Sequence, residues 1–282
     1  MGKRLRKTFA ETVSADSSVG VYGSFDIVGD IAITKLPRVS PAEAKEVARV
    51  IMDVNKRVKA VFIQTSAVAG DFRVRGLTYA AGENRTLTVH KESGCAFAVD
   101  VEKCYFSPRL LHERQRIAHL VQPNETVINM FAGVGCFSIL IAKRQPTAKV
   151  YSIDINPTAV KLMRENIRIN RVFNKVFPLL GDAKEIIENQ LQHCADRVLM
   201  PLPEKAYEYL PCAVSALKPS GGWIHVHTFE HVAKTEDSAE KVRQKVTSKL
   251  GSLGVNFDVP FIRVVRSTGP NWWHLVANVR IN

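Results

Sequence analysis

The feature that most constrains the fold of this chain is the regular alternation of apolar strands and helical segments that begins at Thr126. The predicted strands are 126–131, 149–153, 175–180, 197–200 and 222–228, and the predicted helices are 137–144, 157–170, 204–217 and 236–250. Alternation at this spacing is typical of a mostly parallel sheet with helices on both faces. Two final strands, 255–267 and 272–281, follow each other directly, so we expect an antiparallel hairpin at one edge of a seven-stranded α/β sheet.

Residues 25–102 have a different pattern, which predicts a small α+β domain. A strand pair, or one strand bulged around Gly29, should open this domain. Ser40 as N-cap, Pro41 in the first turn and a capping-box Glu43 then predict a helix. Further strands are expected at 58–64, 72–79, 86–90 and 96–99. These elements should form a meander packed on one helix.

The sequence therefore divides into three parts. Residues 1–24 are a basic N-terminal segment, and 25–102 are the small domain. The α/β domain takes residues 103–282, and its first part, 103–121, connects the two domains through a helix at 107–121.

The charge balance limits what the chain can bind. The 282 residues carry 39 Lys and Arg against 27 Asp and Glu, a net charge of +12, which favours a polyanionic partner such as nucleic acid. No apolar run approaches the roughly 18 residues that a membrane helix requires, so a membrane-spanning protein is excluded. The five cysteines include no C-x-x-C pair, so we expect reduced thiols, no metal site and a cytoplasmic setting.

A glycine-containing turn follows the first strand of the α/β domain, where such sheets bind nucleotide-like ligands. Gly133 and Gly135 allow the backbone to approach a ligand closely, but Ser138 stands where a dinucleotide fingerprint has its third glycine. Asp154 ends the next strand, 21 residues after Gly133, where a carboxylate can accept both hydroxyls of a ribose. Asp182 ends the third strand and is well placed to bind the adenine amino group.

Together these signals favour an adenosine ligand without a pyrophosphate. S-adenosylmethionine fits that description better than a nicotinamide dinucleotide does. For Asp154 or Asp182 taken alone, a helix N-cap is an equally good interpretation. The joint spacing of the glycine turn and the two strand-end carboxylates favours the cofactor site.

Several segments resemble the archaeal and eukaryotic tRNA (guanine-N1)-methyltransferases, which modify the base 3′ of the anticodon. The most specific are Tyr105–Arg114 and Met130–Ser138, and the others are Phe72–Arg75, Ala81–Glu83, His90–Gly94, Asp154–Pro157, Gly181–Ala183 and Arg197–Pro203. The resemblance covers roughly residues 25–280. It implies a class I, Rossmann-like methyltransferase domain, the cofactor S-adenosyl-L-methionine, and a small preceding domain that helps to form the guanine pocket.

The resemblance also implies roles for individual residues. Glu113 matches the glutamate that removes the N1 proton of guanine, and this chemistry needs a positioned carboxylate base. Arg73, with Arg75 as its reserve, matches the arginine that stabilises negative charge on O6. The expected cofactor-binding residues are Tyr105, Phe131, Gly133, Gly135, Asp154, Asn156, Asp182 and Met200. The expected substrate-binding residues are Arg75, Arg109, Arg114, Pro201 and Pro203.

Purely structural interpretations exist for the same charged residues. Glu113 lies between Arg109 and Arg116 at spacings of four and three residues, so it could belong to an ordinary surface ion pair on a helix. Arg73 and Arg75 could be alternate charges on a strand. The motif context favours the functional interpretation in each case.

The chain departs from the family pattern in three places. Asn129 stands where the family commonly has aspartate, and Pro201 where an asparagine helps to hold guanine. No room is left before residue 25 for the extra domain with which many relatives touch the tRNA corner, so weaker selectivity for folded tRNA is expected.

The segment Pro201–Pro203 also bears on the methyl acceptor. It lacks the polar first residue and the aromatic residue typical of exocyclic-amine methylases, which favours a ring nitrogen as methyl acceptor.

The favoured function is methyl transfer to N1 of guanosine 37, with the tRNA anticodon stem-loop as partner and no obligate protein partner. The sibling enzyme of wyosine synthesis is the main alternative, since it uses the same cofactor and transfers its aminocarboxypropyl group. A catalytically silent RNA-binding relative would keep the fold, but Glu113, Asp154 and Asp182 argue against it. Basic segments along the chain, and one of Trp272 and Trp273, are candidates for phosphate and base contacts.

Overall fold

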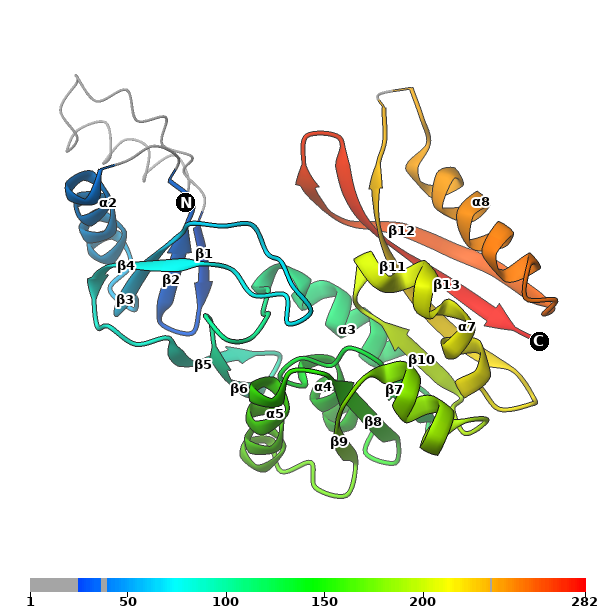
Figure 1. Ribbon diagram of the computed structural model, residues 1–282. Helices are drawn as coiled ribbons and strands as arrows, with labels where there is room; N and C mark the ends of the chain where they lie inside the picture. The colour runs from blue at the N-terminus through cyan, green and yellow to red at the C-terminus, as the bar shows by residue number, and fades with distance from the viewer. Residues whose placement is uncertain (1–24, 37–39, 234) are drawn as a thin grey trace. The chain divides into compact units, whose positions relative to one another are not determined.

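The computed structural model describes residues 25–36, 40–233 and 235–282, so the basic segment predicted at 1–24 lies outside the described residues. The chain divides into two compact units, 1–108 and 109–282. The sequence pattern changes slightly earlier, at residue 103. Figure 1 labels most of the helices and strands of both units.

The first unit contains a four-stranded sheet in the order β1-β2-β3-β4. Its strands are β1 (Phe25–Val28), β2 (Ile31–Thr34), β3 (Ala60–Gln64) and β4 (Leu77–Gly82). β1 and β2 form a hairpin at Gly29, whose φ of 59° suits glycine best. β2 and β3 are parallel, because α2 (Pro41–Val54) carries the chain back between them.

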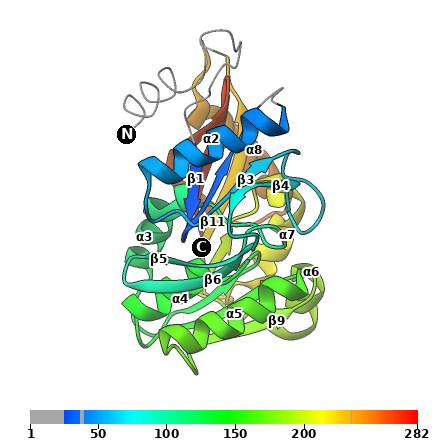
Figure 2. The same ribbon diagram turned by 90° about the vertical axis from the view of Figure 1, so that its left-hand side faces the viewer.

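Helix α2 begins as its sequence predicts. The Ser40 side chain accepts a hydrogen bond from the Glu43 backbone N–H, and the Glu43 carboxylate accepts one from the Ser40 N–H, which completes the capping box. Its buried face, including Val47 and Ile51, packs with Val61 of β3 in one apolar cluster. The helix therefore lies against one face of the four-stranded sheet (Figure 2).

The predicted meander is wrong. The parallel pairing of β2 with β3 replaces one antiparallel connection, and β5 (Leu87–Glu92) and β6 (Cys95–Asp100) form a separate two-stranded sheet. Local alternation predicts that strands exist, but the helix between β2 and β3 decides their direction.

The strand predicted at 72–79 begins only at Leu77. The residues before it form a turn, closed by an isolated bridge between Ala69 and Val74. Arg73 lies in this turn with a φ of 54°, so it is not one of two alternate charges on a strand.

The second unit is an α/β domain whose seven-stranded sheet has the order β12-β13-β11-β10-β7-β8-β9. Its strands are β7 (Thr126–Asn129), β8 (Lys149–Asp154), β9 (Val176–Leu180), β10 (Arg197–Met200), β11 (Gly222–His231), β12 (Phe257–Gly269) and β13 (Trp272–Ile281). The pairings among β7 to β11 are parallel, whereas β13 is antiparallel to both β11 and β12. The predicted fold, a mostly parallel sheet with an antiparallel C-terminal hairpin, is confirmed.

The predicted helices of this unit are present with small shifts at their ends. They are α3 (Leu111–Leu120), which follows a 3-10 turn at Pro108–Leu110, α4 (Cys136–Arg144), α5 (Pro157–Asn170), α7 (Ala206–Ala216), which follows a 3-10 turn at Pro203–Lys205, and α8 (Ser238–Gly251). No pattern in the sequence indicated α6 (Ala183–Ile186) or the π-helical turn at Ile187–Leu191 that continues it. This segment is shorter than the window over which helical periodicity can be recognised.

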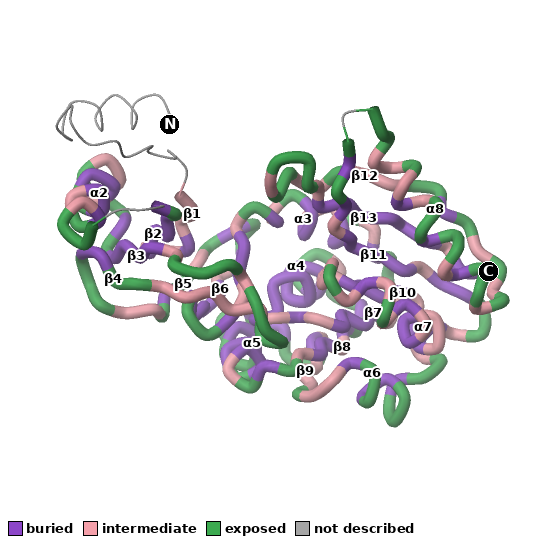
Figure 3. The backbone as a smooth tube through the Cα atoms, turned by 45° about the horizontal axis from the view of Figure 1, so that its top comes forward, coloured by how far each residue is buried: buried purple, intermediate pink, exposed green. Residues whose placement is uncertain are grey.

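Alternate residues of β11 face opposite sides of the sheet. Ile224 and Val226 belong to the apolar core that contains residues of α6, α7 and α8. His225 and His227 therefore face the other side, where Glu113 of α3 lies near His227. The central strands of the sheet are buried along most of their length (Figure 3).

The strand order reverses between β7 and β10. From β7 the chain moves through β8 to β9 on one side, and later through β10 to β11 on the other. The loops after the carboxyl ends of β7 and β10 consequently diverge, and an open α/β sheet binds its ligand at such a point.

Candidate active site

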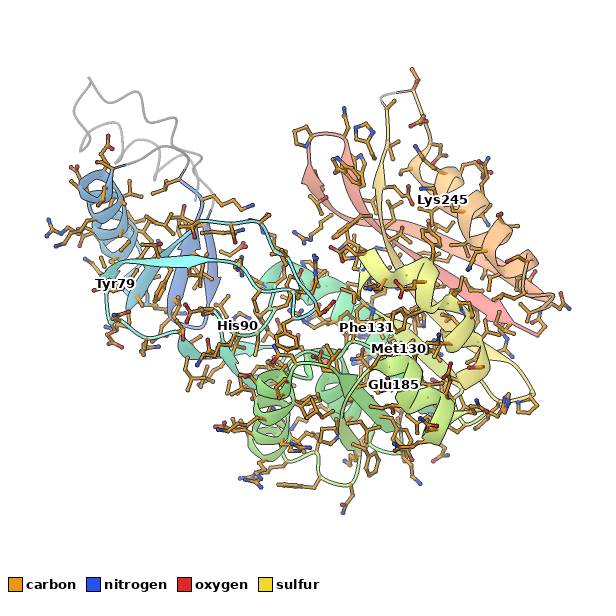
Figure 4. The ribbon with its side chains drawn as sticks, in the orientation of Figure 1. Tyr79, His90, Met130, Phe131, Glu185 and Lys245 are labelled. Carbon is orange, nitrogen blue, oxygen red and sulfur yellow. The ribbon has the colours of Figure 1, made fainter. Side chains whose placement is uncertain are left out.

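The glycine turn lies at this reversal point, directly after β7 (Figure 4 labels Met130 and Phe131 there). Gly133 has a φ of 56°, and Gly135, the N-cap of α4, has a φ of 90°. A Cβ added at Gly135 would lie 2.7 Å from Met163 Cγ. Both the backbone conformation and the neighbouring side chain therefore require glycine at 135.

Asp154 holds the glycine turn to the end of β8. Its Oδ2 accepts a hydrogen bond of 2.6 Å from Gly133 N–H, and its Oδ1 accepts one of 2.9 Å from Asn156 N–H. Burial raises the pKa of Asp154, and the two backbone N–H groups oppose that shift. Because an ionised carboxylate has about four acceptor positions, Asp154 can also accept the hydroxyls of a ribose.

Asn156, and not Asp154, performs the N-cap role at the start of α5. Its Oδ1 accepts hydrogen bonds from Thr158 N–H at 3.0 Å and Ala159 N–H at 3.4 Å, so it caps α5. Asp182 likewise caps α6 through Lys184 N–H at 2.7 Å.

Asp182 has a second partner that the sequence analysis did not identify. The Tyr209 hydroxyl, on α7, donates to Asp182 Oδ2 at 2.5 Å. Burial and the Asp182 carboxylate raise the pKa of Tyr209, which keeps its hydroxyl protonated. The Tyr209 ring also contacts the edge of Phe131, with 5.2 Å between centroids. A carboxylate and two aromatic rings thus gather near the glycine turn, a combination suited to a purine.

The predicted binding residues at the carboxyl end of β10 differ in their exposure to solvent. Met200 is fully buried in the core, so its side chain is not accessible to a ligand in this conformation. Pro201 and Pro203 are half-buried and follow β10 directly, at the reversal point.

Glu113 forms an ion pair, but not a surface one. Its side chain is fully buried, and Arg116 donates to it twice, from Nε to Oε2 at 2.9 Å and from Nη2 to Oε1 at 2.6 Å. His227 Nε2 lies 3.8 Å from Glu113 Oε1. The His227 ring contacts Phe137 in the first turn of α4, with 6.2 Å between centroids. The Glu113 carboxylate therefore lies close to the helix that starts at the glycine turn.

A buried polar network supports Arg116, and no motif in the sequence indicated it. Arg116 Nη2 donates to Asn278 Oδ1 at 3.3 Å, and this oxygen lies 2.7 Å from His225 Nδ1. His225 Nε2 in turn lies 2.7 Å from Arg197 Nη1, and Arg197 forms a bidentate ion pair with Glu125. The only local signal is an alternation of histidines in β11, whose partners come from strands far away in the sequence.

The predicted arginines are distributed over both units. Arg73 and Arg75 belong to the first unit, where the Arg75 guanidinium donates to Gln64 Oε1 and to the Phe106 carbonyl, each at 3.4 Å. Arg109 and Arg114 belong to the second unit, where Arg109 is exposed and Arg114 is buried. Tyr105 lies in the first unit and is half-buried.

The fold and the site define a class of protein. A parallel sheet with an antiparallel terminal hairpin, a glycine turn after its first strand and a carboxylate at the end of the next strand are the features of a class I, S-adenosylmethionine-dependent methyltransferase. Two family models match the chain: the TRM5/TYW2 methyltransferase domain over residues 88–253 and the TYW2 N-terminal domain over residues 5–86. The chain belongs to the TRM5/TYW2 methyltransferase domain family.

Individual relatives have different named activities. The chain is 41% identical to the tRNA (guanine(37)-N(1))-methyltransferase Trm5b of Pyrococcus abyssi, over 92% of this chain and 75% of that protein. It is 37% identical to the tRNA 4-demethylwyosine(37)-methyltransferase Taw21 of Saccharolobus solfataricus, over 93% and 95%. It is 33% identical to the tRNA(Phe) (4-demethylwyosine(37)-C(7)) aminocarboxypropyltransferase of Methanocaldococcus jannaschii, over 90% and 96%.

A solved structure of a relative includes its RNA. The complex of aTrm5 and tRNALeu matches with a TM-score of 0.81 and 35% identity, over 100% of this chain and 76% of that chain. In the part of this chain that the structure describes, no helix is long and apolar enough to cross a membrane.

Proposed function

We propose that this chain transfers the methyl group of S-adenosylmethionine to N1 of guanosine 37 in tRNA. Relatives named for this reaction, and a structural neighbour solved with tRNA, support the choice of substrate. In this proposal Glu113 is the general base and Arg73 stabilises O6.

The residues at the glycine turn fit the cofactor. The turn has no room for a side chain at Gly135, and Asp154 keeps acceptor positions beyond its two backbone donors. Phe131 and Tyr209 offer aromatic surface, and Asp182 a carboxylate, to an adenine ring. When bound, S-adenosylmethionine supplies an electrophilic methyl carbon on a positively charged sulfur.

The Glu113 carboxylate is the observation that carries the proposal. Guanine N1 is a poor nucleophile while it holds its proton, so a base must accept that proton as the new C–N bond forms and the C–S bond breaks. Arg116 holds both carboxylate oxygens of Glu113 beside the start of α4. Negative charge that develops on O6 needs a cation, which is the role proposed for Arg73.

The test uses the full chain, S-adenosylmethionine labelled in its methyl group, and a tRNA transcript with G37. We expect label in the RNA, recovered as 1-methylguanosine after nuclease digestion. A matched transcript with A37 should remain unlabelled. Transfer to the A37 transcript, or no transfer to G37, would contradict the proposal.

Aminocarboxypropyl transfer is the second candidate, and one observation favours it: residues 5–86 match the TYW2 N-terminal domain. The same cofactor labelled in its carboxyl group separates the two reactions, because only aminocarboxypropyl transfer retains that label in the RNA. The acceptor in this arm is tRNA that carries 4-demethylwyosine, the base named for the M. jannaschii relative. Methyl label on this second RNA would instead match the reaction for which the S. solfataricus relative is named.

A further inference from the structure

Buried histidines lie on the face of the large sheet that Glu113 approaches. His225 and His227 come from β11 and His274 from β13, and each is at most 2% exposed. His227 Nδ1 lies 2.9 Å from His274 Nε2. Since His227 Nε2 lies 3.8 Å from Glu113 Oε1, the His227–His274 pair stands next to the carboxylate assigned as the base.

The tautomer of His225 follows from its partners. Arg197 can only donate, so His225 Nε2 must be the bare nitrogen and His225 Nδ1 carries the hydrogen. That hydrogen is donated to Asn278 Oδ1, which also accepts from Arg116. His225 is therefore an Nδ1–H tautomer.

His227 and His274 are both neutral at physiological pH. Burial, with repulsion from Arg116 and Arg263, lowers the pKa of His227 to about 3. Burial, together with electrostatic repulsion from His227 and Arg266, lowers the pKa of His274 to about 2. Each ring then carries one N–H, and the short contact between them allows only two arrangements of the two hydrogens.

The Glu113 carboxylate distinguishes these arrangements. In the first, His227 Nδ1–H donates to His274, and the bare Nε2 of His227 faces a negatively charged oxygen. In the second, His274 Nε2–H donates to His227, and His227 presents its own Nε2–H to Glu113. At 3.8 Å this last contact is too long for a hydrogen bond, but a donor is attracted to a carboxylate where a lone pair is repelled.

The opposite end of the pair supports the same choice. His274 Nδ1 and Arg266 Nε are both buried without a hydrogen-bond partner among the described residues. Arg266 and His274 are direct cross-strand partners on β12 and β13. The second arrangement leaves His274 Nδ1 bare to accept from the Arg266 N–H, directly or through one water, whereas the first would set two N–H groups against each other.

We propose that His227 and His274 are positioning residues for Glu113, held as Nε2–H tautomers in a polar chain from Arg266 through both imidazoles to Glu113 Oε1. This inference rests on the proposed role of Glu113 as the base. With Arg116 on one side and His227 on the other, the carboxylate keeps one orientation toward the guanine proton.

The tautomers can be measured directly on the full chain labelled with 15N at its histidines. Long-range 1H–15N spectra separate bare from protonated ring nitrogens, and single His→Gln variants assign the signals. We expect Nε2–H for His227 and His274, and Nδ1–H for His225 as the internal contrast. A bare Nε2 on His227, or an imidazolium at pH 7, would overturn the proposal.

Activity gives the second test, through variants that keep or remove the donor. His227→Leu removes the N–H that faces Glu113 and should lower kcat by about tenfold, with little change in KM for S-adenosylmethionine. His227→Gln keeps an N–H near the same place and should recover most of kcat. His119→Gln, at an exposed position of α3, is the matched control and should leave kcat unchanged.

His274→Phe keeps His227 but removes its partner. This variant tests whether the His227–His274 pair positions Glu113 even if His227→Leu does not fold. We expect the same loss of kcat, and an unchanged kcat would overturn the proposal. If the wild-type spectra show the expected tautomers in a chain that modifies no G37 transcript, the proposed function fails while the assigned tautomers of His227 and His274 stand.

Discussion

Glu113 is a fully buried carboxylate that forms an ion pair with Arg116. A buried carboxylate is stable only when its charge is matched and its oxygens accept hydrogen bonds. Arg116 donates one hydrogen bond to each oxygen of Glu113, and Arg263 Nε lies 4.0 Å from Oε2 as a second cation. A surface pair at the same helical spacing would contribute little and would not need a supporting network. The polar groups around Arg116 are therefore the sign of a constrained site rather than of a stabilising ion pair.

Glu113→Gln preserves the shape of this side chain and removes its basicity. We expect methyl transfer to fall by about 100-fold or more, the range associated with a lost general base, while S-adenosylmethionine still binds. Single-turnover kinetics and calorimetric titration of the cofactor measure the two effects. Glu208→Gln, at an exposed position of α7, is the control, and a wild-type rate in Glu113→Gln would remove its assignment as the base.

The buried histidines make stability depend on pH. The pKa of His225 is well below its usual value, that of His227 is about 3 and that of His274 is about 2, so the unfolded chain binds more protons below pH 6.5. The free energy of unfolding should therefore fall as the pH is lowered from 7 toward 4.5, by up to about 1.4 kcal/mol per pH unit for each histidine. Urea titrations at several pH values measure this slope.

His274→Phe should reduce the pH dependence of the free energy of unfolding by the contribution of one histidine, up to about 1.4 kcal/mol per pH unit. His231→Phe, at an exposed position near the end of β11, should leave it unchanged. Parallel pH profiles for the wild type and His274→Phe would contradict the prediction.

At the scale of elements, α7 does more than cover the sheet. It brings the Tyr209 hydroxyl to Asp182 at the start of α6, and thereby joins the segment that follows β10 to the one that follows β9. The position of Asp182 depends on this contact as well as on its own N-cap bond.

Removal of the Tyr209 hydroxyl should therefore weaken cofactor binding. We expect Tyr209→Phe to raise the Kd for S-adenosylmethionine by about fivefold, which corresponds to the roughly 1 kcal/mol of one hydrogen bond. Tyr207→Phe, two residues away on α7 and bonded to Glu230 instead, is the matched control. Equal Kd values for the two variants would mean that Tyr209 does not act through the site.

The elements whose signals are local were predictable from the sequence. The helix capped by Ser40, the glycine turn and the strand–helix alternation after Thr126 depend on neighbouring residues, and all three are present. The order of strands in the first unit was not predictable, because strand direction is set by a crossover helix and not by alternation. Tyr209 also escaped prediction, since its partner Asp182 precedes a different helix, and so did the histidines, whose partners come from neighbouring strands.

At the scale of the whole molecule, the charge of +12 bears on how RNA would be bound. Phosphate contacts release counterions, so the affinity for an anticodon stem-loop should fall as salt rises. We expect a linear decrease of log affinity with log salt concentration, with a slope of about 0.7 for each single-strand phosphate contacted. Fluorescence anisotropy titrations of a labelled stem-loop at salt concentrations from about 50 to about 200 mM measure this slope. The affinity for S-adenosylmethionine is the control and should change far less; an RNA affinity independent of salt would contradict the prediction.

The hydrogen bond from Gly133 to Asp154 has a consequence for the energetics of ligand entry. Because the carboxylate already holds the turn, the backbone between β7 and α4 loses its conformational freedom when the protein folds. A ligand that reaches this turn meets a preorganised surface and suffers little further loss of backbone entropy. The affinity of the turn for a ligand should then depend mainly on the contacts that the ligand makes. A substitution of Asp154 that loosens the turn should lower the affinity for every adenosine ligand to a similar extent.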